Sequence, residues 1–106
     1  PDQRIYGSKK NYKPLSYSVI KHGIVGMTKY YASLYAKNKI RCNCLSPGGV
    51  YNKQNKKFTK KLISRIPLGR MAKKDEYRGS IQFLASRASD YMTGQNIVID
   101  GGRSII

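Results

Sequence analysis

The chain has 106 residues and carries 21 lysines and arginines against five aspartates and glutamates, a formal net charge of +16. A hydrophobic share of 40% is enough for a small folded core, which argues against wholesale disorder. No apolar run approaches the roughly 20 residues that cross a bilayer. Two cysteines are too few for a disulfide scaffold. Composition therefore excludes a membrane protein, a secreted miniprotein and a collagen-like chain.

The positive charge is concentrated in one long stretch, because no acidic side chain occurs between Gln3 and Lys74. Such a surface attracts phosphate polyanions, and the nine tyrosines offer rings on which bases can stack. The sequence has no zinc-finger ligand set, ribonucleoprotein motif or helix-turn-helix, however. We favour a solvated, lysine-rich surface. A small basic nucleic-acid-binding module is the alternative.

The first helix follows a polar segment, residues 1–16, for which the sequence predicts a loop. Apolar residues then recur at three- and four-residue steps, which predicts an amphipathic helix over about 17–37 with Ser16 as its N-cap. The apolar stripe consists of Ile20, Ile24, Met27, Tyr31 and Leu34.

A short strand is predicted directly after this helix, over residues 40–46, because Ile40, Cys42 and Cys44 fall on one side and Pro47 ends the run. A helix followed at once by a strand is half of an α/β crossover unit. The connection that follows, 47–72, is irregular and basic, with one helical candidate over 55–66.

The last part of the chain, 73–106, predicts a second helix over about 74–87 and a strand over 96–100. Asp75 and Glu76 would lie in the first turn of that helix, where negative charge favours the helix dipole. The residues expected to be buried on it are Tyr77, Ile81, Leu84, Ala85 and Ala88. The order of elements predicts an α/β fold with a parallel sheet.

One pair of residues carries possible chemistry. Tyr17 and Lys21 are four residues apart, so a helix places them on one face. A free phenol, with a pKa of about 10, exchanges protons poorly at neutral pH, and a nearby ammonium favours its phenolate form. By spacing alone, however, such a pair is more often an ordinary surface pair.

The surrounding motifs give the pair more weight. In chain order, the sequence has Tyr17-Ser18-Val19-Ile20-Lys21, Gly26-Met27-Thr28-Lys29, Ile40-Arg41-Cys42-Asn43, Pro47-Gly48-Gly49-Val50, Thr93-Gly94-Gln95 and Asp100-Gly101-Gly102. From Ser16 onward, this series resembles the second half of a short-chain dehydrogenase/reductase.

The resemblance implies roles for five residues. Tyr17 would be the catalytic acid–base beside the cofactor, and Lys21 would lower its pKa and bind the nicotinamide ribose. Pro47 and Gly48 would form the turn beside the nicotinamide, and the backbone of Val50 would bind the carboxamide. The cofactor would be NAD or NADP, and the substrate an alcohol or a ketone.

The chain also departs from the family pattern. Asn52 stands where the family often has a threonine that contacts the cofactor, although an amide can still donate a hydrogen bond. The glycine-rich turn that cradles a pyrophosphate is absent, and neither Ser8 nor Ser16 can be assigned as the catalytic serine.

We therefore expect residues 1–106 to be the C-terminal fragment of one Rossmann-like, doubly wound domain, lacking the N-terminal dinucleotide-binding half. Its parts would be a loop (1–16), the catalytic helix and strand (17–46), a substrate-lid loop (47–72) and the last helix and strand (73–106). The fragment alone would be inactive. The intact parent would be a cytoplasmic homo-oligomer.

Two further groups have ordinary interpretations. Cys42, Cys44 and His22 are too few for a structural zinc site, so we predict no metal and interpret the thiols as small buried groups of a reduced protein. The lid contains a lysine cluster, for which we favour a solvated loop. The alternative is that it screens an anionic substrate. The cluster consists of Lys53, Lys56, Lys57, Lys60 and Lys61.

Overall fold

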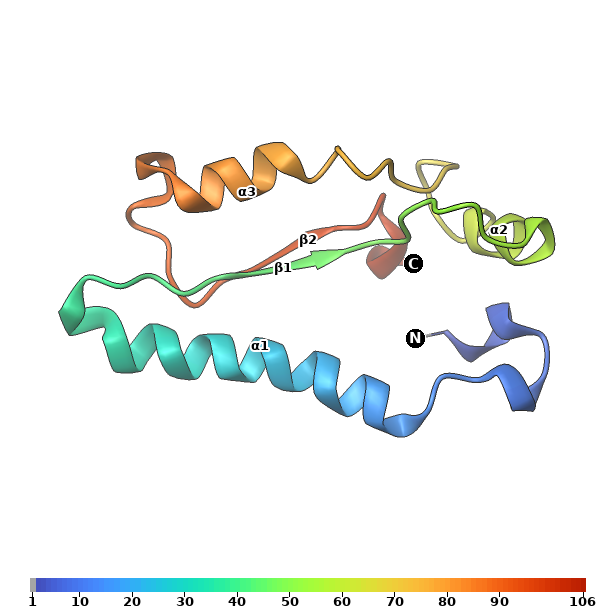
Figure 1. Cartoon of the computed structure of the whole chain (residues 1–106), viewed down its shortest axis with the longest axis horizontal. Coiled ribbons are helices and arrows are strands. Elements are labelled where there is room, and N and C mark those ends of the chain that lie inside the picture. The colour runs from blue at the N-terminus through green and yellow to red at the C-terminus, as the bar shows by residue number, and fades with distance from the viewer. Residues whose placement is uncertain (1) are drawn as a thin grey trace.

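The computed structural model describes residues 2–106 and arranges them in three layers (Figure 1). A two-stranded parallel sheet, β1 (Cys44–Pro47) and β2 (Asn96–Ile99), lies between α1 (Leu15–Tyr35) and α3 (Arg78–Ala85). The remaining helix, α2 (Lys56–Ile63), lies at one end of the molecule beside the N-terminal segment. Helices on both faces of a parallel sheet confirm the predicted α/β class.

The first strand is shorter than the predicted 40–46 and begins only at Cys44. The residues before it are held by one backbone hydrogen bond, from the Gly94 N–H to the Cys42 carbonyl at 2.7 Å, and by hydrogen bonds that involve side chains. The Arg41 guanidinium and the Asn43 amide both donate to the carbonyl of Met92, at 3.3 and 2.8 Å. The second strand forms where it is predicted, one residue shorter.

The long helix begins two residues before its predicted start of 17 and ends at Tyr35 rather than 37. The prediction that Ser16 is the N-cap is wrong. Pro14 holds the cap position with an extended backbone (ψ 155°), and no side chain caps the helix. A proline pre-sets its own φ near the helical value, so a helix can begin directly after it, and Ser16 then falls within the first turn.

The helix α1 turns small side chains towards the sheet and large apolar ones away from it. Thr28 and Ala32 are buried, with 6% and 4% of their surface exposed, which lets the backbones approach closely. The predicted apolar stripe lies on another face, where Ile20 is 62% and Met27 is 52% exposed. No described element of this chain covers that stripe.

The N-terminal segment is more ordered than the predicted loop. It forms two 3-10 turns, η1 (Gln3–Tyr6) and η2 (Lys9–Asn11). Its Ile5 is buried against Leu62 of α2 and against residues of the following loop, which form the main apolar core. That core is completed by Ile66 and Met71, with Tyr6, Phe58 and Ile63 packed at its edge.

The helix α3 is shorter than the predicted 74–87, and Asp75 and Glu76 precede it rather than forming its first turn. The Glu76 carboxylate instead accepts hydrogen bonds from the Arg70 guanidinium and from the backbone N–H of Lys73, which closes a tight turn before the helix.

The side chains expected to be buried on this second helix are only partly so. Tyr77 and Leu84 are half-buried, whereas Ile81, Ala85 and Ala88 are exposed. The thiols of Cys42 and Cys44, also expected to be buried, are half-exposed and free. Both departures have the same cause, because few residues of the chain are available to pack against these faces.

The surface of the chain is large for its size. Its accessible area is 8341 Å², whereas a self-contained globule of 12.0 kDa exposes about 6,000 Å². Its radius of gyration is 16.1 Å, against about 13 Å for a compact domain of this length. Among the described residues, no helix combines the length and apolarity that crossing a membrane requires.

Candidate active site

The first half of α1 carries the two residues that the sequence singles out for chemistry. Tyr17 and Lys21 lie one helical turn apart, and the Lys21 ammonium Nζ is 5.7 Å from the centre of the Tyr17 ring. Tyr17 is 40% exposed, so its hydroxyl is open to a ligand. The pair can thus act on one bound molecule.

A second ammonium lies near the same ring, and it was not among the residues predicted for the site. Lys13 Nζ lies 5.6 Å from the centre of the Tyr17 ring and 5.8 Å from that of Tyr6. The Gln3 side chain fixes the Lys13 backbone, since it accepts from the Lys13 N–H at 3.0 Å and donates to the Lys13 carbonyl at 2.9 Å. Two ammonium groups therefore lie within 6 Å of the centre of the Tyr17 ring.

Two hollows meet at Tyr17, beside the carboxyl end of β1. The first, of about 310 Å³, lies between α1 and β1 and has Tyr17, Lys21, Ser46 and Pro47 in its walls. The second, of about 510 Å³, is the Tyr17 hollow, and its walls include Tyr17, Pro47, Gly48 and Val50. In open α/β sheets, ligands bind outside the carboxyl ends of the strands. The Tyr17 hollow lies there, whereas the first hollow runs along β1 from Cys44 to Pro47.

The structure therefore brings the five predicted site residues to one place. Four of them line the Tyr17 hollow together, and Lys21 lines the adjoining one with Tyr17 and Pro47. Two of these residues lie in the first half of α1, and the others lie at the end of β1 and in the loop after it. Most of the helix separates the two groups along the chain.

The loop after β1 is held in position at Val50. Val50 forms a bridge with Ala72, in which the Ala72 N–H donates to Gly49 O and the Tyr51 N–H to Ala72 O, both at 2.9 Å. The Gln54 amide also donates to the Val50 carbonyl, at 2.8 Å. These bonds fix the backbone of the hollow without occupying its interior.

The turn after β2 closes the other side of the Tyr17 hollow. Asp100 accepts hydrogen bonds from the backbone N–H groups of Gly102, at 2.9 Å, and Ser104, at 2.8 Å. Burial disfavours the charge of Asp100, but the bonds from Ser104 and Gly102 outweigh it, and the pKa of this carboxyl lies below its ordinary value. Its oxygens serve this turn, so we assign Asp100 a structural part.

Sequence reasoning missed several residues of the site. Tyr6 and Phe58 line the Tyr17 hollow, with ring centres 5.7 Å apart, and Gln54 braces it. The aromatic types of Tyr6 and Phe58, each within a polar segment, were the signal available. Nothing in the sequence shows that these two segments meet.

The residues weighed for a metal have other contacts in the structure. The ring Nδ1 of His22 lies 2.9 Å from the Ser18 carbonyl, one turn back on α1. Cys44 contacts Asn96, its neighbour across the sheet. Within residues 2–106, no group of three or more metal-binding side chains comes together.

Comparison with known proteins agrees with this geometry. Residues 5–104 match the family described as enoyl-(acyl carrier protein) reductase. The 3-oxoacyl-(acyl-carrier-protein) reductase of Thermotoga maritima is 43% identical over 102 residues, which cover 92% of this chain and 40% of that protein. The 2-dehydro-3-deoxy-D-gluconate 5-dehydrogenase of Bacillus subtilis is 37% identical, over 82% of this chain and 37% of that protein.

Solved structures give the same result. A short-chain dehydrogenase from Leptospira borgpetersenii with bound NAD+ superposes with a TM-score of 0.90 at 42% identity, covering 98% of this chain and 39% of that one. A gluconate 5-dehydrogenase from Burkholderia cenocepacia in complex with NADP and tartrate has a TM-score of 0.84 at 29% identity, covering 96% and 42%.

The fold is thus that of a doubly wound, Rossmann-like α/β protein, with its site at the carboxyl ends of the strands. The chain belongs to the short-chain dehydrogenase/reductase family. It spans about two fifths of the length of the relatives that it matches.

Proposed function

We propose that this chain supplies the proton-transfer residues and part of the nicotinamide site of an NAD(P)-dependent oxidoreductase that interconverts an alcohol and a ketone. The observation that carries the proposal is the position of Tyr17 and Lys21 beside the Pro47-Gly48 turn, at the carboxyl end of a parallel strand. The relatives with bound NAD+ and NADP support this choice of cofactor.

The chain's own residues suit the nicotinamide part of such a cofactor. Gly48 lies in the wall of the Tyr17 hollow, where a ring can lie against the backbone of the turn. Lys21 faces the hollow between α1 and β1, where its ammonium can donate to ribose hydroxyls. Val50 offers backbone groups beside these residues. When bound, the nicotinamide gives a hydride to the substrate carbon or takes one from it.

Proton transfer is the part of Tyr17. In the direction of reduction, its hydroxyl gives its proton to the carbonyl oxygen as that carbon becomes a carbinol, and the phenolate remains on the enzyme. We assign to the positive charge of Lys21 the stabilisation of that phenolate. The Lys21 and Lys13 ammonium groups lie 5.7 and 5.6 Å from the centre of the ring. In the direction of oxidation, the phenolate takes the proton back from the alcohol.

The proposal also covers the substrate and the oligomeric state of the intact enzyme. The substrate is a small alcohol or carbonyl compound, and the intact enzyme is a homo-oligomer, with the exposed apolar stripe of α1 as a surface that needs covering. The 106 residues alone are inactive. The match of residues 5–104 to the family, together with the NAD+-bound relative, favours this function over a basic nucleic-acid-binding module.

The test is a titration of the intact enzyme with NAD+ and NADP+ by calorimetry, followed by assays with polyols and sugar acids at the nicotinamide absorbance band. We expect saturable binding of at least one cofactor and reduction of bound NAD(P)+ by at least one alcohol. Failure of both cofactors to bind would contradict the proposal.

A further inference from the structure

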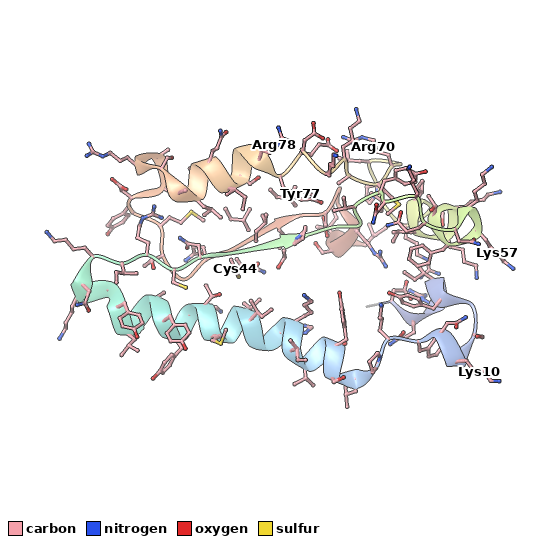
Figure 2. All side chains as sticks on the ribbon, in the orientation of Figure 1. Lys10, Cys44, Lys57, Arg70, Tyr77 and Arg78 are labelled. Atoms are coloured by element: carbon pink, nitrogen blue, oxygen red, sulfur yellow. The ribbon has the colours of Figure 1, made fainter. Side chains whose placement is uncertain are left out.

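A third hollow, separate from Tyr17 itself, opens at the end of the molecule where α2 meets the N-terminal segment. Its volume is about 550 Å³, which is ample for a phosphate or a larger phosphorylated group. Figure 2 places Lys57 of α2 and Lys10 of the N-terminal segment at this same end of the molecule. We name this cavity the basic hollow.

The polar groups in its walls are suited to donate hydrogen bonds. Two ammonium groups, of Lys57 and Lys61, stand with the side chains of Ser8, Asn11 and Asn55 around the cavity. The side-chain oxygen Oδ1 of Asn55 already accepts from the backbone N–H of Lys57 at 2.9 Å. The remaining polar group of that side chain is its NH₂ donor. An anion matches such walls, because a cation or a neutral apolar group leaves the donors without acceptors.

The charge of the basic hollow is uncompensated. None of its walls carries an acidic side chain. Among the side chains that the structure describes, the ion pairs are those of Asp2 with Arg4 and Arg65 and of Glu76 with Arg70, and none of them includes a lysine. In a concave site, like charges without counter-charges focus a positive potential and attract anions.

The walls are held by the apolar core rather than by mobile side chains. Ile5 and Leu62 are 4% and 3% exposed and pack together beneath the cavity. Lys61 is half-buried. Its Nζ would be 3.8 Å from a Cβ atom placed on Gly7. Gly7 has a positive φ of 82°, which favours glycine at this turn. The Lys61 ammonium therefore lies beside the Gly7 turn, at the wall of the cavity.

The basic hollow adjoins the site of chemistry. Ile5, Tyr6 and Phe58 line both this cavity and the Tyr17 hollow. A molecule whose carbinol or carbonyl carbon lies at Tyr17 can therefore extend past the Tyr6 and Phe58 rings and place a second group between the lysines.

We propose that the basic hollow is a subsite for a phosphate-bearing group of the substrate, held by Lys57 and Lys61, so that the substrate is a phosphorylated alcohol or ketone. The anion subsite is argued from the cavity alone. The statement that the anion belongs to an alcohol or ketone substrate rests on the proposed function. A concave site with two ammonium groups in its walls suits a small phosphate ester better than a polynucleotide, which binds along an open groove.

The experiment uses the intact enzyme saturated with NAD+, or with NADP+ if that binds more tightly, so that the cofactor's own phosphate sites are filled. Inorganic pyrophosphate is the probe, and its affinity is measured by calorimetry at an ionic strength of about 0.15 M, where the Debye length is about 8 Å. The variant K57Q/K61Q removes two charges from the basic hollow. The matched variant K29Q/K37Q removes two charges from exposed lysines that do not line it. Thermal unfolding of both variants checks that they fold.

We expect pyrophosphate to bind the wild-type enzyme, and K57Q/K61Q to weaken that binding about tenfold or more, since two charge-assisted contacts are lost. K29Q/K37Q should change the affinity less than about twofold, because exposed charges at a distance are screened. No binding to the wild type, or equal weakening in both variants, would overturn the subsite.

The same experiment separates the two proposals. If neither cofactor binds but pyrophosphate binding still depends on Lys57 and Lys61, the oxidoreductase function fails while the anion subsite stands. If a cofactor binds and pyrophosphate does not, the function stands and the subsite fails. If the lysine-dependent site takes single-stranded oligonucleotides more tightly than pyrophosphate, the assignment to a small phosphate ester is overturned in favour of nucleic acid.

Discussion

Gly48 lies against Asp100 so closely that no side chain fits between them: a Cβ on Gly48 would be 2.6 Å from the Asp100 Cα. The contact joins the carboxyl ends of the two strands, and the Gly48 N–H donates to the Ile99 carbonyl at 2.8 Å. The turn that shapes the Tyr17 hollow is thus also the place where β1 and β2 are locked together.

Replacing Gly48 by alanine should therefore lower the stability of the intact enzyme by about 1–3 kcal/mol, the usual cost of overpacking. Because the clash is with backbone atoms, relief requires the turn to move, and cofactor affinity should fall as well. Gly79→Ala in α3 is the matched control, since nothing lies within 4 Å of its Cβ position. It should be neutral or slightly stabilising in chemical denaturation. Equal effects of the two substitutions would contradict the close contact.

Tyr17→Phe should reduce turnover of the intact enzyme by about 10²–10⁴-fold, because the ring is kept and only the transferable proton is lost. Cofactor affinity, measured by calorimetry, should change little. Tyr30→Phe, on an exposed part of the same helix, is the control and should retain full activity. Near-normal turnover of Tyr17→Phe would remove Tyr17 from the mechanism.

Lys21→Met should have a different signature from Tyr17→Phe. One ammonium is proposed to serve both the phenolate and the cofactor ribose, so turnover and cofactor affinity should fall together. Steady-state kinetics with a parallel cofactor titration separates the two effects. Lys29→Met removes a charge from the same helix and should leave both quantities unchanged.

Arg41 joins the segment before β1 to the end of α3. Its guanidinium donates to the carbonyls of Leu84, Ser86 and Met92, at 2.9, 3.3 and 3.3 Å. Arg41→Ala should cost about 2 kcal/mol of unfolding free energy, since hydrogen bonds from a charged donor are lost at a helix C-terminus. Arg87→Ala, an exposed arginine nearby, should cost much less in the same denaturant titration.

Acid should weaken the turn that precedes α3. The Arg70 guanidinium and the Lys73 N–H lower the pKa of Glu76 from 4.5 to about 2. A carboxyl whose pKa is lower in the folded state stabilises the fold above its unfolded pKa, and this contribution is lost as pH falls through the folded value. The difference in melting temperature between wild type and Glu76→Gln should therefore shrink between about pH 5 and pH 2.

The control for that pH titration is Asp75→Asn, which removes a neighbouring carboxylate that forms no ion pair among residues 2–106. Its difference from the wild type should vary less over this pH range. A constant difference for Glu76→Gln would mean that the Arg70–Glu76 pair does not form in solution.

The 106-residue polypeptide by itself should neither bind NAD(P) at micromolar concentration nor remain monomeric. Its two-stranded sheet has unpaired edges, and the stripe on α1 leaves Ile20 and Met27 more than half exposed. Calorimetry and sedimentation of this polypeptide are the measurements. A stable monomer that binds cofactor would show that these residues form a complete domain.

The sequence by itself determined the features that depend on local spacing. The alternation of helix and strand follows from apolar periodicity, and Tyr17 and Lys21 share a helix face because four residues make about one turn. The position of α2 within 55–66 follows in the same way from its local pattern. These properties need no knowledge of what lies opposite each element.

Only the tertiary structure decided the features that depend on contacts between distant residues. The Gln3 side chain bonds to the backbone of Lys13, ten residues further along the chain, and the Lys13 ammonium then lies 5.6 Å from the centre of the Tyr17 ring. Glu76 was expected in the first turn of α3 but precedes it, because its carboxylate accepts a hydrogen bond from the Arg70 guanidinium at 2.6 Å. Periodicity could not show which face of α1 is buried. The sheet packs against the face with small side chains and leaves the apolar stripe exposed. Such choices rest on the shape of the neighbouring surface, which the order of residues along one helix does not contain.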